Sequence, residues 1–150
     1  MRFAINLLWV VFGGGLIVTI EWLLIGALLC LTLIGIPFGI ACFHIAGLTI
    51  WPLGREAIRA DMIGQKAGPG AGCANVIWFP AGLLLALIHA VFGFLLCVTI
   101  IGIPFGIIHF KLAEHALAPL GKRIVSTEMA QAARARALEK RLSGALGDPG

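Results

Sequence analysis

Two ionisable side chains, Glu21 and His89, lie within long apolar stretches of the sequence. An ionisable group at membrane depth needs a partner or water to hold its charge, so such a residue is a candidate functional site. An imidazole titrates near neutral pH, and a neighbouring carboxylate would bias its charge. If the fold brings Glu21 and His89 together, they predict a proton relay or a cation site. The alternative is that Glu21 lies near the headgroups and His89 bonds to the neighbouring backbone.

Metal binding and enzymatic chemistry are not predicted. Cys42, His44 and His109 are potential ligands, but no second ligand pair has suitable spacing, and the four cysteines form no Cys-x-x-Cys motif. The sequence also lacks a nucleophile–base pair, a phosphate-binding loop and paired carboxylates. We therefore expect no enzyme activity, no cofactor and no bound metal.

The composition is typical of a membrane protein. Apolar residues make up 60% of the chain and charged residues 12%, against about 25% charged residues in soluble domains. Two long runs, 22–54 and 74–110, contain no Asp, Glu, Lys or Arg. Each run exceeds the roughly 20 apolar residues that cross a hydrocarbon core about 30 Å thick. A cleaved signal peptide is disfavoured, because only Arg2 is basic at the N-terminus and the apolar character continues far beyond it.

The sequence contains an internal duplication. Residues 26–40 and 93–107 are identical at 12 of 15 positions, at a constant offset of 67. An Asn-x-x-Trp motif stands upstream of each copy, at an offset of 69. Repeats of this kind are common in transport proteins. The motif residues, predicted to be interfacial anchors in an aromatic belt, are Asn6, Trp9, Asn75 and Trp78.

Each copy of the shared IGIPFGI stretch is predicted to break a helix. Proline lacks an N–H and disfavours helical geometry in the residue before it, and the flanking glycines permit a sharp turn. An ion-lining role is the alternative, because broken helices expose N–H groups and carbonyls. The predicted turn residues are Gly35, Pro37, Gly39, Gly102, Pro104 and Gly106.

A kink is predicted at Gly13–Gly15, because residues 3–34 as one straight helix would be about 48 Å long. Pro80 marks a similar position in the second copy.

The predicted fold is all-α, an integral membrane protein of two tandem helix-break-helix repeats with a cytoplasmic C-terminal helix. Two hairpins give four membrane segments, or fewer if the second segment of a repeat is interfacial or re-entrant. The last segment raises that alternative, because it carries Lys111, Glu114 and His115, and charges at mid-bilayer cost several kcal/mol each. The predicted boundaries are membrane repeat 1 at 1–58, a cytoplasmic Gly/Pro-rich linker at 59–73, membrane repeat 2 at 74–125 and a cytoplasmic helical tail at 126–150.

The basic residues predict the orientation of the chain. They precede the first apolar run, lie between the two runs and follow the second, so the positive-inside rule predicts cytoplasmic N- and C-termini in a multi-pass protein. A nucleic-acid partner is not predicted, because these residues flank membrane segments and form no aromatic-interleaved patch. The tail has a Ser/Thr cap and strong helix formers, so it could lie on anionic lipid, bind a cytoplasmic partner or simply fix the orientation.

Taken together, these features resemble the YccF-like family of small bacterial inner-membrane proteins, which carry the inner membrane component domain. The resemblance rests on the Asn-x-x-Trp starts, the paired GIPFG stretches, the Phe-x-x-Ala and Pro-x-Gly endings, and a Ser-x-Glu-x-Ala-Gln-Ala-Ala run that begins at Ser126. It covers nearly the whole chain. It implies a bacterial inner-membrane location and two copies of the domain, and it implies no reaction, ligand or catalytic residue.

The leading functional hypothesis is a small channel or transport component, which rests on the duplication, the broken helices and the isolated Glu21. The alternative is a non-conducting scaffold or accessory protein that recruits a partner through its basic tail. The lipid bilayer is the expected environment. A homo-oligomer is predicted, because four helices enclose little space and the packing motifs are rich in glycine.

Overall fold

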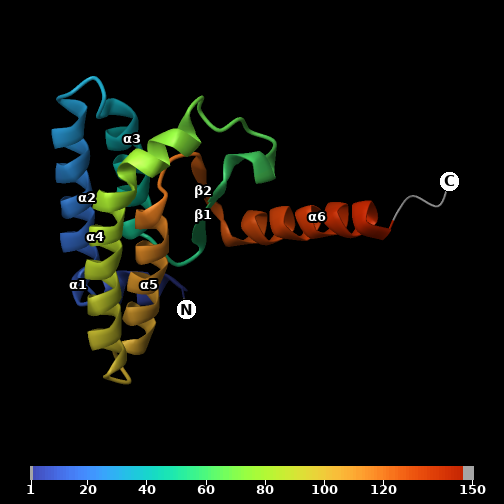
Figure 1. Cartoon of the computed structure of the whole chain (residues 1–150). Helices are drawn as coiled ribbons and strands as arrows, with labels where there is room; N and C mark the ends of the chain where they lie inside the picture. Colours follow the sequence, from blue (N-terminus) through green and yellow to red (C-terminus); the bar gives the residue numbers. More distant parts are fainter. Residues whose placement is uncertain (1, 147–150) are drawn as a thin grey trace.

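The computed structural model describes residues 2–146 and consists mainly of helices. Two helical hairpins stand beside a small sheet, from which the last helix projects (Figure 1). In chain order the elements are α1 (Arg2–Val11), α2 (Gly15–Cys30), α3 (Ile36–Thr49), β1 (Arg55–Arg59), the 3-10 helix η1 (Ala60–Ile63), α4 (Ala71–Cys97), α5 (Ile103–Leu117), β2 (Lys122–Ser126) and α6 (Thr127–Leu146).

The element boundaries refine the predicted division of the chain. The predicted end of repeat 1, at 58, falls inside β1, and α4 begins at Ala71 rather than 74. The predicted tail begins one residue before α6, and its residues 147–150 lie outside the described residues.

The structure contains a two-stranded antiparallel sheet, so the all-α prediction is wrong at β1 and β2. A left-handed glycine precedes each strand, Gly54 at φ 93° and Gly121 at φ 79°, and turns the chain after each hairpin. Local sequence patterns do not predict this pairing, because the two strands are distant in the sequence and each has its partner in the other repeat.

The register of the sheet relates the two repeats by a pseudo-twofold axis. Ala57 lies opposite Ile124, which is its own equivalent at the offset of 67. The same offset converts each pair on one side of this centre into the matching pair on the other side. The pair of Arg55 and Ser126, for example, is equivalent to the pair of Lys122 and Arg59. The axis therefore passes through the central pair of the sheet.

Aromatic contacts between the hairpins follow the same symmetry. Trp9 packs on Phe105 with ring centroids 6.3 Å apart, and the equivalent Trp78 stacks on Phe38 at 5.7 Å. Each hairpin thus inserts a phenylalanine against the tryptophan of the other. The main hydrophobic core contains all four rings.

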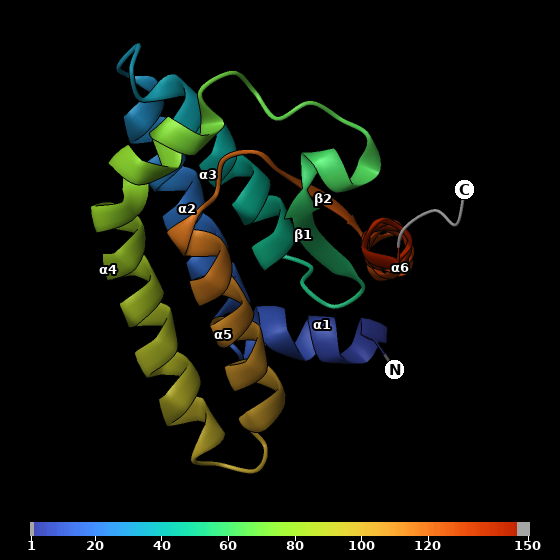
Figure 2. The same ribbon diagram turned by 45° about the vertical axis from the view of Figure 1, so that its right-hand side comes forward.

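The two hairpins point in opposite directions. The turn at 31–35 lies at the upper end of the helical layers and the turn at 98–102 at the lower end (Figures 1 and 2). A twofold rotation produces this arrangement when its axis runs across the helices rather than along them.

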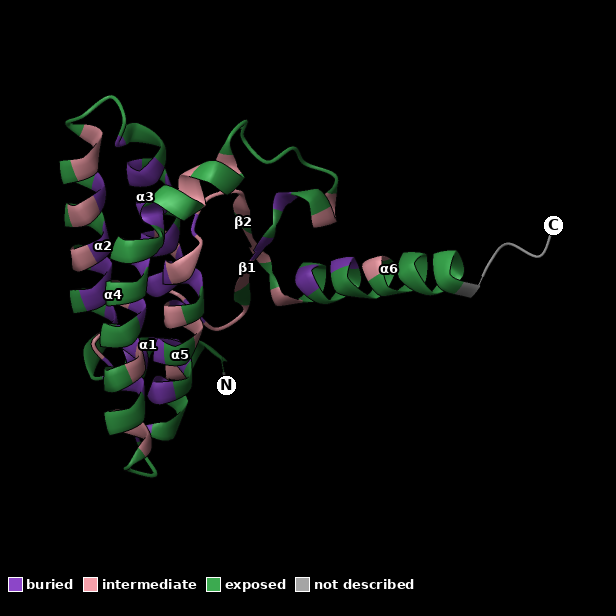
Figure 3. Ribbon diagram, viewed as in Figure 1, coloured by how far each residue is buried: buried purple, intermediate pink, exposed green. Residues whose placement is uncertain are grey.

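The helices form an inner and an outer layer relative to the sheet. Inner helices α3 and α5 are mostly buried, whereas outer helices α2 and α4 expose long apolar faces (Figure 3). Of the described helices, α4 alone is long and apolar enough to cross a membrane. The α1–α2 pair would be a second if counted as one span, but it bends by 69°.

The bend between α1 and α2 confirms the predicted kink at Gly13–Gly15. Gly14 adopts a left-handed φ of 82° between the two helices. Pro80, in contrast, lies inside an uninterrupted α4.

Of the predicted turn residues, only Gly35 and Gly102 lie in the turns. The chain reverses at 31–35 and 98–102, where the Thr32 hydroxyl accepts the Gly35 N–H and the Thr99 hydroxyl accepts the Gly102 N–H, at 3.0 and 3.1 Å. Pro37 follows the first residue of α3, as Pro104 does in α5, where a missing N–H leaves no helical bond unmade. Thr-x-x-Gly was the overlooked sequence pattern.

Gly39 and Gly106 serve close helix packing rather than turning. Neither has a positive φ. A Cβ on Gly39 would lie 2.6 Å from the Gly26 carbonyl oxygen, and one on Gly106 would lie 2.6 Å from that of Gly93. The absence of a side chain therefore lets the two helices of each hairpin approach closely.

We predict that Gly39→Ala lowers the free energy of unfolding by about 1–3 kcal/mol, because the added methyl group meets backbone that cannot yield. Gly47→Ala is the matched control in the same helix, since a Cβ there meets nothing within 4 Å. The control should be neutral or stabilise by up to about 1 kcal/mol. Denaturant titration in detergent measures both, and equal effects would contradict the packing role.

Candidate functional site

The Asn-x-x-Trp motifs form the same clamp in both repeats. The Asn6 amide donates to the Leu53 carbonyl at 3.0 Å and accepts the Leu53 N–H at 2.9 Å. Asn75 makes the same two bonds to Leu120, both at 3.1 Å. Each asparagine thus satisfies both backbone groups of the leucine in a Pro-Leu-Gly turn and fixes the chain where it leaves the hairpin.

The tryptophans of the motifs complete the clamp. Trp9 Nε1 donates to the Thr49 carbonyl at 2.7 Å, and Trp78 Nε1 donates to that of Ala116 at 2.8 Å. Both rings are buried, as is Asn6, and Asn75 is half-buried. The tryptophans are not exposed to lipid as belt residues would be, because they bind carbonyls near the C-terminal ends of α3 and α5 inside the protein. Local sequence patterns do not predict these contacts, because the carbonyls that accept the hydrogen bonds are distant in the sequence. The depth of the four motif residues in the membrane stays a prediction.

His89 has a different partner from the one predicted. Its Nδ1 lies 3.2 Å from Nδ1 of His109, and its ring stacks on Trp22. Both histidines are buried. One Nδ1 must donate and the other accept, so the two rings share one proton at this contact and cannot both be imidazolium while the bond lasts.

Glu21 lies close to the histidine pair without bonding to it. Within residues 2–146, no hydrogen bond or ion pair joins Glu21 to His89. All three groups line one cavity of about 300 Å³, between the α1–α2 kink and helices α4 and α5. His109, predicted from the sequence only as a potential metal ligand, completes this polar group.

The cavity combines a half-exposed carboxylate with a buried imidazole that has a free nitrogen. In the described part of the chain, His89 Nε2 is buried without a hydrogen-bond partner. The entrance carries the exposed apolar side chains of Phe12, Ile17 and Phe92. A small polar molecule or a water chain would find hydrogen-bonding groups here, at the apolar surface of the helices.

The structure assembles no metal centre from the described residues. No three His, Cys, Asp or Glu side chains among them are placed to hold one ion. Cys42 is buried in α3, whereas His44 is exposed on the same helix. The absence of a metal and of a cofactor stays a prediction.

Ion pairs join the polar elements outside the helical layers. Arg2 bonds to Glu128 at 2.8 Å, and Arg134 bonds to Glu56 at 2.7 Å. The hydrogen bond from Arg2 holds the pKa of Glu128 below its usual value. These contacts tie the N-terminus and β1 to α6.

The fold and its buried polar groups define a small helical membrane protein with two copies of a hairpin–strand unit. The chain belongs to the YccF family, whose model, the inner membrane component domain, matches residues 4–55 and 73–122. This membership assigns it to the bacterial inner membrane.

Two curated relatives carry the same description. The chain is 38% identical over 140 residues to "Inner membrane protein YccF" of Escherichia coli (strain K12) and to that of Shigella flexneri. The aligned residues cover 89% of this chain and 94% of each relative. No solved structure matches the chain.

We predict that His89→Phe and His109→Phe are coupled in stability. Each single variant leaves a buried imidazole without its partner and should cost about 1–3 kcal/mol, whereas the double variant removes both polar groups. The double variant should therefore be less destabilised than the sum, by about 0.5–3 kcal/mol. Unfolding in detergent of all four proteins measures the cycle, and additive effects would show that the two rings do not interact.

Proposed function

We propose that the protein is a non-conducting, non-enzymatic membrane scaffold that is embedded from the cytoplasmic side and presents α6 to a partner. The single observation that carries this proposal is the position of the charged sheet on the pseudo-twofold axis. The positive-inside rule assigns the basic sheet and linker, and with them both termini, to the cytoplasm.

The charges of the sheet support a position in water. Glu56 in β1 pairs with Arg134, and burial of an unpaired charge at the bilayer centre costs several kcal/mol. Because the axis runs through this sheet, it points from water towards the bilayer, and both repeats enter the membrane from the same side. The charged residues of the two strands are Arg55, Glu56, Arg59, Lys122 and Arg123.

Both hairpin turns then lie at the same depth, since rotation about an axis along the membrane normal preserves depth. Leu33 and Ile100 at their tips are 88% and 87% exposed, and such side chains favour hydrocarbon over water. Packed helical layers lie about 8–10 Å apart, and one leaflet offers about 15 Å of hydrocarbon. We therefore infer that the hairpins lie along the cytoplasmic leaflet, which replaces the multi-pass topology predicted from the sequence.

Helix α6 supports the scaffold role. Its first two turns pack Ala130 and Ala133 against Ile58 of the sheet, in a second hydrophobic cluster. The C-terminal part of the helix projects from the body (Figures 1 and 3), and Leu138 and Leu142 are exposed one turn apart. Most of the stability of a helix in a protein comes from packing of one of its faces, so a partner that covers the leucines would stabilise it.

The one-sided topology predicts that the hairpin tips are inaccessible from the periplasm. Leu33→Cys and Ile100→Cys, each in a background without the native cysteines, should stay unlabelled by a membrane-impermeant maleimide in intact spheroplasts. Ser143→Cys on α6 is the control and should react only in inside-out vesicles. Labelling of both tips from outside would contradict the proposal and support hairpins that cross the membrane.

A transport role is the second candidate, and the cavity that contains Glu21, His89 and His109 favours it. A carboxylate beside two imidazoles at the apolar surface suits a proton or cation relay. A chain with both hairpins in one leaflet offers no path across the bilayer, so this role requires hairpins that reach the other leaflet, in one chain or in a homo-oligomer that joins such cavities.

Two variants separate the candidates. Deletion of residues 134–150 should abolish capture of a cytoplasmic partner from a scaffold, and Leu138→Ala/Leu142→Ala in the full chain should do the same if the leucines carry the contact. For a transporter, Glu21→Gln should abolish ion flux into liposomes while the tail deletion leaves it intact. Flux from the full chain that Glu21→Gln removes would overturn the scaffold proposal.

A further inference from the structure

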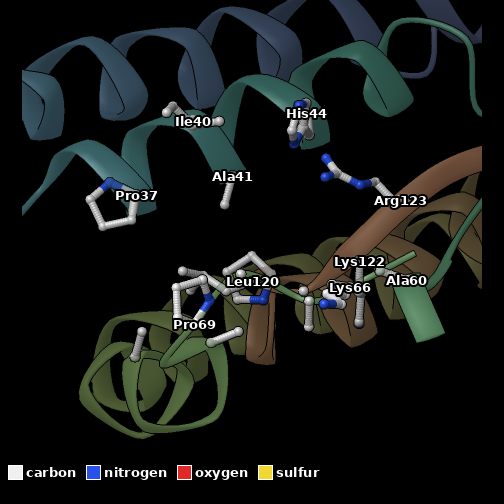
Figure 4. Close-up of a pocket in the computed structure, with 16 residues that line it drawn as sticks. Pro37, Ile40, Ala41, His44, Ala60, Lys66, Pro69, Leu120, Lys122 and Arg123 are labelled. Atoms are coloured by element: carbon white, nitrogen blue, oxygen red, sulfur yellow. The ribbon is translucent and has the colours of Figure 1, made fainter. Parts of the chain in front are cut away.

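A second cavity, of about 230 Å³, lies between α3, the chain that enters α4 and the chain that enters β2 (Figure 4). Pro37, Ile40 and Ala41 of α3 contribute to an apolar wall. In Figure 4 the Arg123 guanidinium extends towards His44, while Lys66 and Lys122 lie across from them. The described residues that line the cavity include no Asp or Glu.

The pseudosymmetry of the fold explains why this cavity is open. Lys111 occupies the position equivalent to His44, at the offset of 67. Lys111 Nζ donates to two carbonyls of the first repeat, those of Pro52, at 3.1 Å, and Arg55. The shorter His44 makes no such contact within the described residues, so the equivalent space beside His44 is unfilled.

The electrostatics of the cavity favour an anion. Lys122 is half-buried, and burial lowers its pKa while the Glu114 carboxylate, outside the cavity, opposes this shift. The N-terminal end of α4 at Ala71 also lines the cavity and contributes its partial positive charge. A bound anion would therefore stabilise a cluster of like charges.

We propose that this cavity binds the phosphate group of an anionic phospholipid headgroup. Lysine and arginine donate charge-assisted hydrogen bonds to phosphate oxygens. The apolar wall includes the exposed side chain of Ile40 on α3, against which an acyl chain can lie. The site fixes the protein to lipid and requires neither a partner nor flux, so it goes beyond the scaffold proposal.

The test is calorimetric titration of the full chain in neutral detergent with three probes: short-chain phosphatidylglycerol, short-chain phosphatidylcholine and inorganic phosphate. Saturable binding of phosphatidylglycerol, with phosphatidylcholine at least about tenfold weaker, is expected. Lys66→Ala and Arg123→Ala should each weaken it by about tenfold, since each removes a hydrogen bond between charged groups. Lys140→Ala on α6 removes an equal charge elsewhere and should have no effect.

The variant His44→Lys distinguishes binding in the cavity from general electrostatic attraction of the lipid to a basic protein. The new lysine should fill the cavity as Lys111 fills its counterpart, so binding should fall although the positive charge increases. Unchanged or tighter binding in His44→Lys, or no saturable binding of any probe, would overturn the proposal. Inorganic phosphate that binds as tightly as phosphatidylglycerol would identify a site for free phosphate and contradict the lipid source.

Discussion

Pairing of β1 with β2 is the constraint on which the rest of the structure depends. Strands from two repeats exchange backbone hydrogen bonds around the Ala57–Ile124 pair, and this pairing fixes the axis that relates the repeats. The axis turns the hairpins in opposite directions and brings each phenylalanine of the IGIPFGI stretch onto the tryptophan of the other repeat. Because the same sheet is charged and holds α6, it also separates the polar side of the molecule from the apolar one.

The repeats are alike in their framework and different in their polar residues. Both keep the asparagine clamp on a Pro-Leu-Gly turn and the close glycine contact within the hairpin. The two repeats differ in the polar residues that line the two cavities. The histidine pair lies in one half of the interface between repeats, and His44 stands where the other repeat has Lys111. The two repeats thus form a symmetric body, and differences between them coincide with one polar cavity and one basic cavity within it.

The sequence predicted what depends on neighbouring residues and missed what depends on distant ones. The kink at Gly14, the duplication and the family follow from local composition and spacing. The sheet, the clamp of Asn6 on Leu53 and the His89–His109 contact join residues 20 to 71 positions apart, and no periodicity within one segment indicates them. The glycines were identified correctly as special, and Gly35 and Gly102 lie in turns as predicted. Gly39 and Gly106 instead serve packing, because spacing alone does not reveal what a missing side chain faces.

The distance between the hairpin tips tests the central claim, that a twofold axis across the helices turns the repeats in opposite directions. Spin labels at Leu33→Cys and Ile100→Cys, in a cysteine-free background in lipid, would report it by pulsed electron paramagnetic resonance. The tips lie near opposite ends of α4, a helix of 27 residues, so a distance of about 40 Å is expected. Hairpins that run side by side in the same direction would give less than about 20 Å, and that result would contradict the account.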